Sequence, residues 1–377
     1  MNKKVLLTAT VQSHIAQFHK PLILMLKENG YEVHVAARDN LAEKNGLQLN
    51  EPDKVFNIPF DRSPLSKNNI AAYQDLNRIL SENKYDVVHC NTPMGGVVTR
   101  LAANKYRRNG TKVFYTAHGF HFYKGAPKKN WIIYYPIEKF LLRYTDKLIT
   151  ISKEDFNTAK EKKFKTKIEH IHGVGANTDK YFLPSNKLIQ DLRLQIGYSK
   201  EDFICVCTGE LNDNKHQISV LRAVPAILKT IPNFKLILAG NGPKHTSLQK
   251  FITEMDLVDC VRMTGYVTDL EKYVMISDIA VSLSLREGLG LNLIEAMLCA
   301  KPVIGSVNRG HKELINHLIN GLLVNPLDSE ELSDAIIKIY RDQEMKSRMG
   351  QNALLHSQKY TRESVIEELT KIYELTY

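Results

Sequence analysis

Apolar runs of strand length alternate with longer stretches of helical spacing along the whole chain. In the first half the pattern predicts a polar turn from Val11 to His14, then a helix through Phe18, Leu22 and Leu26 that ends at Gly30. The other elements predicted there are strands 4–10, 32–36, 86–90, 112–116 and 147–151 and helices 68–82, 95–107, 130–144 and one from about Lys153. Such alternation is typical of a doubly wound parallel sheet.

The regular pattern lapses between Ile168 and Ser199 and then begins again. The second series of elements is predicted as strands 203–208, 235–240, 260–264 and 279–285, a short strand at 302–304, and helices 330–342 and 361–377. We therefore expect an α/β chain of two Rossmann-like domains, residues 1–183 and 184–358, followed by a closing segment, residues 359–377.

The stretch Ser284 to Ile304, SLREGLGLNLIEAMLCAKPVI, combines a strand end, a glycine-bearing turn and a helix start. Asn292 is placed to cap that helix. Glu287 would lie in the loop at the strand end and Glu295 in the first turn of the helix, so that two carboxylates could face one polyhydroxylated ligand. Ligands of open α/β sheets bind at such strand ends, where helix N–H groups favour anions and hydrogen-bond acceptors. On spacing alone, Glu295 fits a capping box equally well, and Glu287 fits a solvated loop charge.

Charge is unevenly distributed between the two halves. Residues 1–183 hold 29 Lys and Arg against 17 Asp and Glu, a net +12, whereas residues 184–377 hold 22 against 24, a net −2. A one-sided basic balance favours an acidic partner for the first half: an anionic membrane, a phosphorylated substrate or nucleic acid. A lysine-rich surface that serves only solubility gives the same count.

Other features of composition restrict the class of protein. No apolar run approaches the roughly 18 residues of a membrane span, and the start reads as a strand and not as a signal peptide, so we expect a cytoplasmic protein. The five cysteines are scattered in apolar surroundings and are expected to be buried free thiols. The first turn lacks a G-x-G-x-x-G pattern, which argues against a nicotinamide dinucleotide site, and no metal-ligand spacing occurs.

Two further turns carry candidate chemistry. Lys215 follows Gly209 and opens the second half, where an ammonium and helix N–H groups suit a diphosphate. His118 and His121 follow strand 112–116, where a histidine can hydrogen-bond a sugar hydroxyl or share a proton. Taken alone, Lys215 is better explained as a solvated lysine at a helix end, and His118 and His121 as loop or core histidines.

Several segments together resemble a known family. EGLGLNLIEAMLCAKPVI, with seven residues between Glu287 and Glu295, resembles the E-x7-E signature of family-four retaining glycosyltransferases of the GT-B fold. The turn at 209–215, AGNGP at 239–243, GYVTD at 265–269 and the closing helix extend the likeness along the chain. Residues 115–139 and REGLGLNLIEAM are similar to the EpsD-like capsule and exopolysaccharide glycosyltransferases of bacteria.

The resemblance implies two Rossmann-like domains that face each other across a cleft, with the C-terminal helix crossing back to the first. It implies that Glu287 binds donor-sugar hydroxyls, Glu295 the ribose hydroxyls and Lys215 the diphosphate, and that His118 contacts the sugar near the reacting centre. His118, Lys215 and Glu287 are the expected catalytic residues. The expected donor-binding residues are Gly209, Lys215, Gly242, Tyr266, Val267, Glu287, Leu289, Gly290, Leu291 and Glu295. The expected acceptor or cleft residues are Ser13, His14, Asn91, His118 and His121.

One position departs from the family pattern. The family usually has Arg directly after the glycine of the 209–215 turn, and this chain has Glu210, which cannot neutralise phosphate. Arg286, Arg309 or a first-domain group would have to substitute, or the leaving group rests on Lys215 and backbone donors. The first-domain turn also lacks the family's frequent Gly-Gly.

The implied reaction moves a sugar, an N-acetylhexosamine or deoxy relative, from a UDP-sugar to a lipid-linked saccharide, with retention, no metal and no cofactor beyond the donor substrate. Its setting would be capsular or exopolysaccharide biosynthesis. The first half would attach peripherally to the anionic inner face of the cell membrane through Lys124, Lys128 and Lys129 and the neighbouring Trp131, Ile132, Ile133, Tyr134 and Tyr135. The alternative is that residues 130–144 form an ordinary core helix that packs through Ile133, Ile137, Phe140, Leu141 and Tyr144. Both hold if the helix packs by that face and presents Lys128, Lys129 and Trp131 outward at its start. No nucleic-acid partner is expected.

Other functions remain compatible with the same residues. An epimerase or hydrolase could use this scaffold, because a fold does not determine a function. A basic binding module, or an inactive partner in a biosynthetic complex, is the alternative from another class. The run KEKKFKTK at 160–167 is the one stretch that interleaves basic and aromatic residues, and a solvated helix face explains it better.

Overall fold

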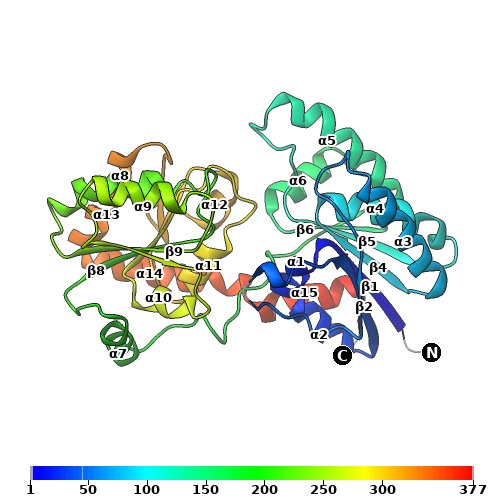
Figure 1. The fold of residues 1–377 in the computed structure, drawn as a ribbon, viewed down its shortest axis with the longest axis horizontal. Helices are drawn as coiled ribbons and strands as arrows, with labels where there is room; N and C mark the ends of the chain where they lie inside the picture. Colours follow the sequence, from blue (N-terminus) through cyan, green and yellow to red (C-terminus); the bar gives the residue numbers. More distant parts are fainter. Residues whose placement is uncertain (1–2, 45, 376–377) are drawn as a thin grey trace. The chain divides into compact units, whose positions relative to one another are not determined.

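A computed structural model describes residues 3–44 and 46–375. The chain divides into two compact units: Met1–Gly175 together with Arg362–Tyr377, and Ala176–Thr361. The boundaries predicted at 183/184 and 358/359 therefore lie eight residues after and three residues before the observed ones. Each unit is a parallel sheet with helices on both faces, so the predicted fold class is confirmed (Figure 1).

The first unit contains a seven-stranded sheet in the order β3-β2-β1-β4-β5-β6-β7. Its strands are β1 (Lys3–Val11), β2 (Tyr31–Arg38), β3 (Lys54–Asn57), β4 (Val87–Asn91), β5 (Lys112–Ala117), β6 (Lys147–Thr150) and β7 (Lys167–His170). The strand order reverses between β1 and β4, which pair directly with Val5 opposite Val87. Side chains that follow these two strands consequently lie at a topological switch point, where α/β sheets bind ligands.

Helices cover both faces of the first sheet (Figure 1). On one face lie α1 (Gln12–Phe18), α2 (Lys20–Glu28) and the C-terminal helix α15 (Arg362–Tyr373). On the other lie α3 (Asn68–Glu82), α4 (Pro93–Arg107), α5 (Lys128–Leu141) and α6 (Lys153–Glu161), with the short 3-10 helices η1 (Ala42–Lys44) and η2 (Leu142–Tyr144) in connections. Val365, Leu369 and Ile372 of α15 are buried with Val5 and Leu7 of β1, so the last helix completes the core of the first unit.

The second unit contains a six-stranded sheet in the order β10-β9-β8-β11-β12-β13. Its strands are β8 (Phe203–Thr208), β9 (Phe234–Ala239), β10 (Val261–Gly265), β11 (Ile279–Ser282), β12 (Val303–Ser306) and β13 (Gly321–Val324). Its helices are α7 (Asn186–Ile196), α8 (Gln217–Leu228), α9 (His245–Glu254), α10 (Leu270–Ile276), α11 (Leu291–Leu298), α12 (Arg309–Leu314), α13 (Ser329–Arg341), α14 (Gln343–Ser357) and the 3-10 helix η3 (Gln358–Tyr360). The strand order reverses between β8 and β11, which makes this pair the second switch point.

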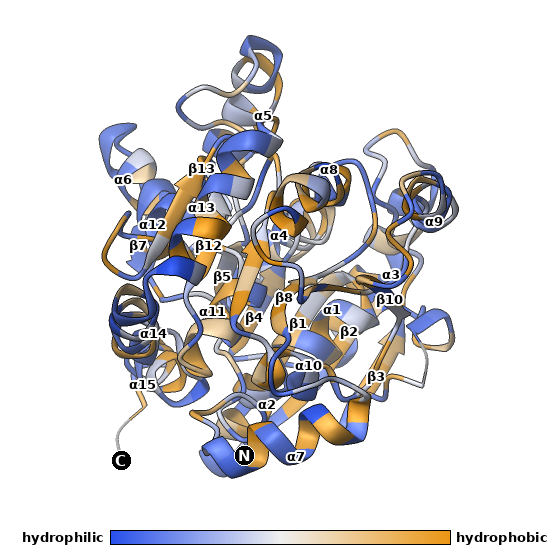
Figure 2. Ribbon diagram, turned by 90° about the vertical axis from the view of Figure 1, so that its left-hand side faces the viewer, coloured by the Kyte–Doolittle hydropathy of each residue, from blue (hydrophilic) through white to orange (hydrophobic). Residues whose placement is uncertain are grey.

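Most strands of the two sheets are buried on both faces, and several of them, such as β8 and β13, are largely orange, the hydrophobic end of the scale, in Figure 2. Cys205 and Cys207 of β8 pack into the same core cluster, as their spacing predicts. All five cysteines are free thiols, and four of them are buried. No helix in the described ranges combines the length and the apolar character needed to cross a membrane.

Several local predictions were wrong. The predicted polar turn Val11–His14 is helical from Gln12, and the helix through Phe18 and Leu22 is two helices separated at His19. Strands β3, β7 and β13 and helices α7, α10, α12 and α14 were not predicted. Strand β3, for example, is largely exposed and has no apolar run. The strand predicted at 279–285 ends at Ser282, and the last two residues of the helix predicted to Tyr377 lie outside the described residues.

Candidate functional site

The switch point of the second sheet brings Lys215 and Glu287 together. Lys215 lies in the turn between β8 and α8, and Glu287 lies in the loop between β11 and α11. Lys215 Nζ donates to Glu287 Oε1 at 2.5 Å. Two residues from different turns thus meet between the two central strands, where a ligand is expected.

The surroundings of this ion pair hold the Glu287 carboxylate in its charged form. Burial alone would raise the pKa of Glu287, but the charge and hydrogen bond of Lys215, with a further hydrogen bond from Ser284, keep that pKa below its usual value. The backbone N–H of Lys215 donates to Asn212 Oδ1 at 2.9 Å, which fixes the turn. Glu287 is therefore an ionised hydrogen-bond acceptor at neutral pH, and Lys215 is a cation beside it.

Two glycines allow the loops after β8 and β9 to lie in contact. Gly240 has φ of 149°, and a Cβ there would lie 2.0 Å from the carbonyl oxygen of Gly209. A Cβ on Gly242 would meet the backbone of Leu211 at 2.4 Å. Gly209, with φ of 136°, lies beside the Lys215 side chain. Larger residues at these positions would push the loop that carries Lys215 away from the strand end.

The loop before α11 is also shaped by a glycine. Gly290 caps α11 with φ of 103°, and Leu289 is buried beside it. A Cβ on Gly310 of α12 would lie 2.9 Å from the backbone nitrogen of Leu289, so α12 approaches this loop closely. Leu291 begins the helix. The prediction that Asn292 caps it was wrong, because Asn292 Nδ2 instead donates to the carbonyl of Thr208 in β8.

Glu295 lies in the second turn of α11 and not at the capping-box position. Burial raises the pKa of Glu295 to about 8, with Lys180 opposing and Glu271 reinforcing the shift. A capping-box acid would be stabilised in its charged form, whereas this carboxyl is poorly solvated and close to another acid. Glu295 is therefore not a capping-box residue. Its buried carboxyl is available to form hydrogen bonds with a polar ligand.

Other residues considered for the donor site also lie in loops that follow strands of this sheet. Tyr266 and Val267 follow β10, and Tyr266 is 52% exposed. Glu210, at the position where the family usually has Arg, is exposed and accepts from Asn212 Nδ2 at 3.0 Å. Arg286 is exposed, and its carbonyl accepts from Asn214 Nδ2. In this structure Lys215 is thus the basic side chain paired with Glu287.

In the first unit four predicted residues gather at the switch point between β1 and β4. Ser13 and His14 follow β1, Asn91 ends β4 and His118 follows β5. His14 Nε2 is 3.2 Å from His118 Nε2, and Asn91 Oδ1 is 3.3 Å from the same His118 nitrogen. Ser13 Oγ accepts from Asn40 Nδ2 at 3.0 Å.

His121 behaves differently from this group. Its ring stacks on Tyr134 of α5 with centroids 4.6 Å apart, and its carbonyl accepts from Asn130 Nδ2 at 2.9 Å. The structure thus gives His121 a packing contact with α5, while His118 joins His14 and Asn91.

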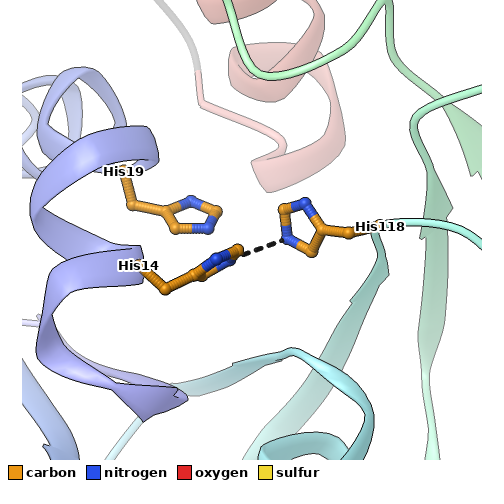
Figure 3. A group of neighbouring side chains, drawn as sticks. All are labelled: His14, His19 and His118. Atoms are coloured by element: carbon orange, nitrogen blue, oxygen red, sulfur yellow. Dashed lines mark hydrogen bonds between the residues drawn. The ribbon is translucent and has the colours of Figure 1, made fainter. Parts of the chain in front are cut away.

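Sequence reasoning missed His19, which lies between α1 and α2 and is 6% exposed. Figure 3 shows its ring beside those of His14 and His118. Burial lowers the pKa of His14 and of His19 well below the usual value and that of His118 to about 4, so all three imidazoles are neutral. Residues five apart in a continuous helix do not lie on the same face. The spacing of His14 and His19 in the sequence therefore gives no signal that their side chains share a site.

Helix α5 carries an exposed apolar surface. Trp131 and Tyr135 pack inward against Phe122, and Glu138 pairs with the buried Arg100. The opposite side, which we call the α5 apolar face, consists of Ile132, Ile133, Ile137 and Phe140, whose exposed fractions are 73%, 52%, 46% and 47%.

The alternative of a core face through Ile133, Ile137 and Phe140 is therefore wrong, although Leu141 is buried as that alternative requires. The prediction that Trp131 projects outward was also wrong: it is half-buried, and its Nε1 donates to the carbonyl of Tyr123. Lys124, Lys128 and Lys129, however, are all exposed.

Two families of glycosyltransferases match this chain, one in each half. Residues 189–356 match the family described as Glycosyl transferases group 1, and residues 4–152 match the family described as Glycosyl transferase 4-like. The protein EpsD of Bacillus subtilis (strain 168), described as a glycosyltransferase, is 40% identical over 99% of this chain and 97% of its own length.

Two more distant relatives are informative. The Escherichia coli UDP-Gal:alpha-D-GlcNAc-diphosphoundecaprenol alpha-1,3-galactosyltransferase is 27% identical over 71% of this chain and 69% of its own. The crystal structure of Anabaena HepE in complex with UDP superposes with a TM-score of 0.77 at 22% identity, covering 99% of this chain and all of that one. The latter likeness concerns the fold alone.

Proposed function

The chain belongs to the glycosyltransferases of the GT-B fold and is similar to EpsD, and on that premise we propose that it is a retaining, metal-independent enzyme that transfers a sugar from a UDP-sugar to a lipid-linked saccharide. The setting that we propose is capsular or exopolysaccharide biosynthesis. The observation that carries the proposal is the contact of Lys215 with Glu287 at the switch point of the second sheet. The two groups are complementary to the two halves of a sugar nucleotide, a diphosphate and a polyhydroxylated ring.

Donor binding separates this pair. The diphosphate attracts the Lys215 ammonium, and Glu287, ionised and released from Lys215, accepts hydrogen bonds from sugar hydroxyls. The backbone N–H groups of Leu289, Gly290 and Leu291 add donors, while Glu295 takes the ribose hydroxyls. The base lies near Tyr266 and Val267.

Charge stabilisation supplies most of the rate enhancement in this mechanism. As the bond between the anomeric carbon and the β-phosphate oxygen breaks, its electron pair goes to the diphosphate, where Lys215 stabilises the growing charge. The acceptor hydroxyl oxygen attacks the same face of the sugar, and its proton passes to the departing phosphate oxygen. Retention follows without a covalent sugar-enzyme intermediate, and Lys215 takes the place of a divalent cation.

The proposed acceptor site is in the first unit, at Ser13, His14, Asn91 and His118. A relative that uses UDP-Gal and a GlcNAc-diphosphoundecaprenol supports both a UDP donor and a lipid-linked acceptor. The UDP complex of a protein with the same fold supports UDP as the nucleotide. An N-acetylhexosamine or deoxy sugar is the transferred group that we propose.

Membrane attachment is proposed through the α5 apolar face. The first unit holds 30 Lys and Arg against 20 Asp and Glu, so it carries the entire net charge of +10, while the second unit holds 21 of each. Exposed isoleucines beside the exposed Lys124, Lys128 and Lys129 match an anionic bilayer surface, which attracts each cation by about 1 kcal/mol and buries apolar side chains. We therefore propose a peripheral position at the inner face of the cell membrane.

A screen of nucleotide sugars by thermal shift tests the donor, because a ligand that binds only the folded state stabilises it by mass action. The screen should find one UDP-sugar that stabilises more than UDP, and product analysis with that donor and membrane lipid extract should show a sugar joined to lipid. A changed sugar nucleotide without transfer would indicate an epimerase, and free sugar alone a hydrolase.

A further inference from the structure

Three histidine side chains of the first unit converge on one point. Figure 3 shows the rings of His14, His19 and His118 facing one another from α1, from the junction of α1 with α2, and from the end of β5. Their potential ligand atoms all lie within 4.8 Å of one another. Among residues 3–44 and 46–375, this is the one group of three or more His, Cys, Asp or Glu side chains that comes so close.

The separation of two of the nitrogens already fits a shared ion. His14 Nε2 and His118 Nε2 are 3.2 Å apart. Two nitrogens bound at about 2.0–2.1 Å to a tetrahedral ion are about 3.3 Å apart. Small rotations of buried rings would bring the third nitrogen to the same distance.

His19 supplies an independent observation. Its side chain is 94% buried, since only 6% is exposed, and its Nε2 has no hydrogen-bond partner in the described part of the chain. A buried polar atom without a partner is costly, and a bound ion would satisfy it. Nearby His89 cannot serve as a fourth ligand, because its two nitrogens are engaged at 2.7 Å by Tyr373 and Thr116.

Space for a further ligand exists beside the cluster. A small cavity of about 20 Å³ is lined by His19, His89, Thr116 and His118. That volume holds about one water molecule. Asn91 Oδ1, 3.3 Å from His118 Nε2, offers a hydrogen-bond acceptor to such a water. Three protein nitrogens and one exchangeable position form an open tetrahedral site.

From these observations we propose that His14, His19 and His118 form a binding site for one transition-metal ion, with Zn²⁺ as the representative ion. Imidazole nitrogens suit Zn²⁺, Cu²⁺, Ni²⁺ and Fe²⁺, whereas Mg²⁺ and Ca²⁺ require oxygen ligands. The site belongs to the first unit, while Lys215, the proposed partner of the diphosphate, belongs to the second.

The site has a consequence that rests on the proposed function. A bound ion occupies the lone pairs of His14 and His118, two residues of the proposed acceptor site. Zn²⁺ therefore inhibits transfer, and a chelator restores it. The metal is an inhibitor of this enzyme and not its cofactor.

The test measures metal binding directly, without donor or acceptor. The full chain, freed of metal with EDTA and then desalted, is titrated with Zn²⁺ by calorimetry and with Co²⁺ by visible absorption. We expect one Zn²⁺ per chain, a tetrahedral Co²⁺ spectrum, and no competition from excess Mg²⁺. His19→Gln should weaken Zn²⁺ binding at least tenfold, while the control His245→Gln, in α9 of the second unit, should not.

Circular dichroism and thermal unfolding of each variant verify the fold. Absence of Zn²⁺ binding at micromolar concentrations, or equal affinity in the wild type and His19→Gln, would overturn the proposal. The ratio of transfer with Zn²⁺ to transfer with EDTA then tests inhibition: it should rise in His19→Gln. Because binding is read without catalysis, failure of the metal site and failure of the proposed function are distinguishable.

Discussion

Lys215 Nζ and Glu287 Oε1 are 2.5 Å apart although 72 residues separate them in the chain. The contact exists because β8 and β11 are adjacent parallel strands whose following loops leave the same edge of the sheet. Each charge is only partly exposed, 23% for Lys215 and 16% for Glu287, so each depends on the other while no ligand is bound. Removal of either side chain therefore leaves the other without its counter-charge.

Lys215→Ala and Glu287→Ala should each lower kcat/KM for transfer by ~100-fold or more, because each removes a group that acts on the donor. The control Lys244→Ala removes a lysine whose partner, Asp213, is largely exposed, and should retain nearly full activity. Steady-state kinetics with the donor concentration varied up to saturation checks the effect. Near-normal turnover in either of the first two variants would refute the site assignment.

The free energy of unfolding should also reflect the contact between Lys215 and Glu287. Each single alanine variant leaves an unpaired, half-buried charge, whereas Lys215→Ala with Glu287→Ala leaves none. The double variant should therefore unfold at a denaturant concentration no lower than the less stable single variant. Strictly additive losses in a double-mutant cycle would show that the contact does not couple the two residues.

Chelation should leave transfer intact. Lys215 supplies the positive charge on the diphosphate, so activity after treatment with EDTA should equal or exceed that of untreated enzyme. Initial rates with and without EDTA, followed by additions of Mg²⁺ and Mn²⁺, check this. Activity lost with EDTA and recovered with either ion would contradict the proposed role of Lys215.

Binding to anionic vesicles should depend on both the charge and the apolar side chains of α5. Lys128→Glu with Lys129→Glu, and separately Ile132→Ser with Ile133→Ser, should reduce sedimentation with phosphatidylglycerol vesicles, since one pair removes attraction and the other removes inserted apolar area. The matched control is Lys187→Glu with Lys338→Glu, two exposed lysines of the second unit.

Salt should weaken the binding of the wild type. Failure of the wild type to sediment with anionic vesicles at low salt would favour an acceptor free in solution.

Glu295 should make stability depend on pH. Its pKa is raised from 4.5 to about 8 in the folded chain, so the folded state holds one more proton than the unfolded state between these values. The contribution of Glu295 to the free energy of unfolding is fully present below about pH 4.5 and is lost as the pH rises through about 8. Glu295→Gln lacks this loss, so its Tm relative to the wild type should increase between pH 5 and pH 9. An unchanged difference in Tm over that range would contradict the raised pKa.

Regular periodicity and glycine positions account for what the sequence could predict. Helix 68–82 was found with the same bounds, because Ala72, Leu76, Ile79 and Leu80 recur at helical spacing and bury one face. The division of charge and the positions of Lys215 and Glu287 at strand ends also follow from local patterns. Such patterns repeat along the chain and need no tertiary information.

Contacts between distant elements account for what could not be predicted. The helix breaks at His19 without interrupting the helical spacing of the apolar residues. The contact between His19 and His118 could therefore not be predicted from the sequence pattern. The exposure of Ile133 and Phe140 depends on which face of α5 packs against Phe122 and Arg100. Both faces contain large apolar residues, so the sequence alone does not show which one is buried. Asn292 has the composition of a cap, but the carbonyl of Thr208 in the neighbouring strand competes for its side chain.

The C-terminal helix α15 gives the chain a definite order of assembly on the ribosome. The 186 residues of Ala176–Thr361 separate the rest of the first unit from the helix that covers its core. At about 5–20 residues per second, synthesis of that insertion takes about 10–40 s.

During this interval the nascent first unit exposes the surface that Val365, Leu369 and Ile372 later bury, and His89 lacks its partner Tyr373. The first unit therefore begins to be synthesised first but is completed last. A truncated gene product or a proteolytic cut that lacks only α15 would leave the core of this unit exposed next to His118.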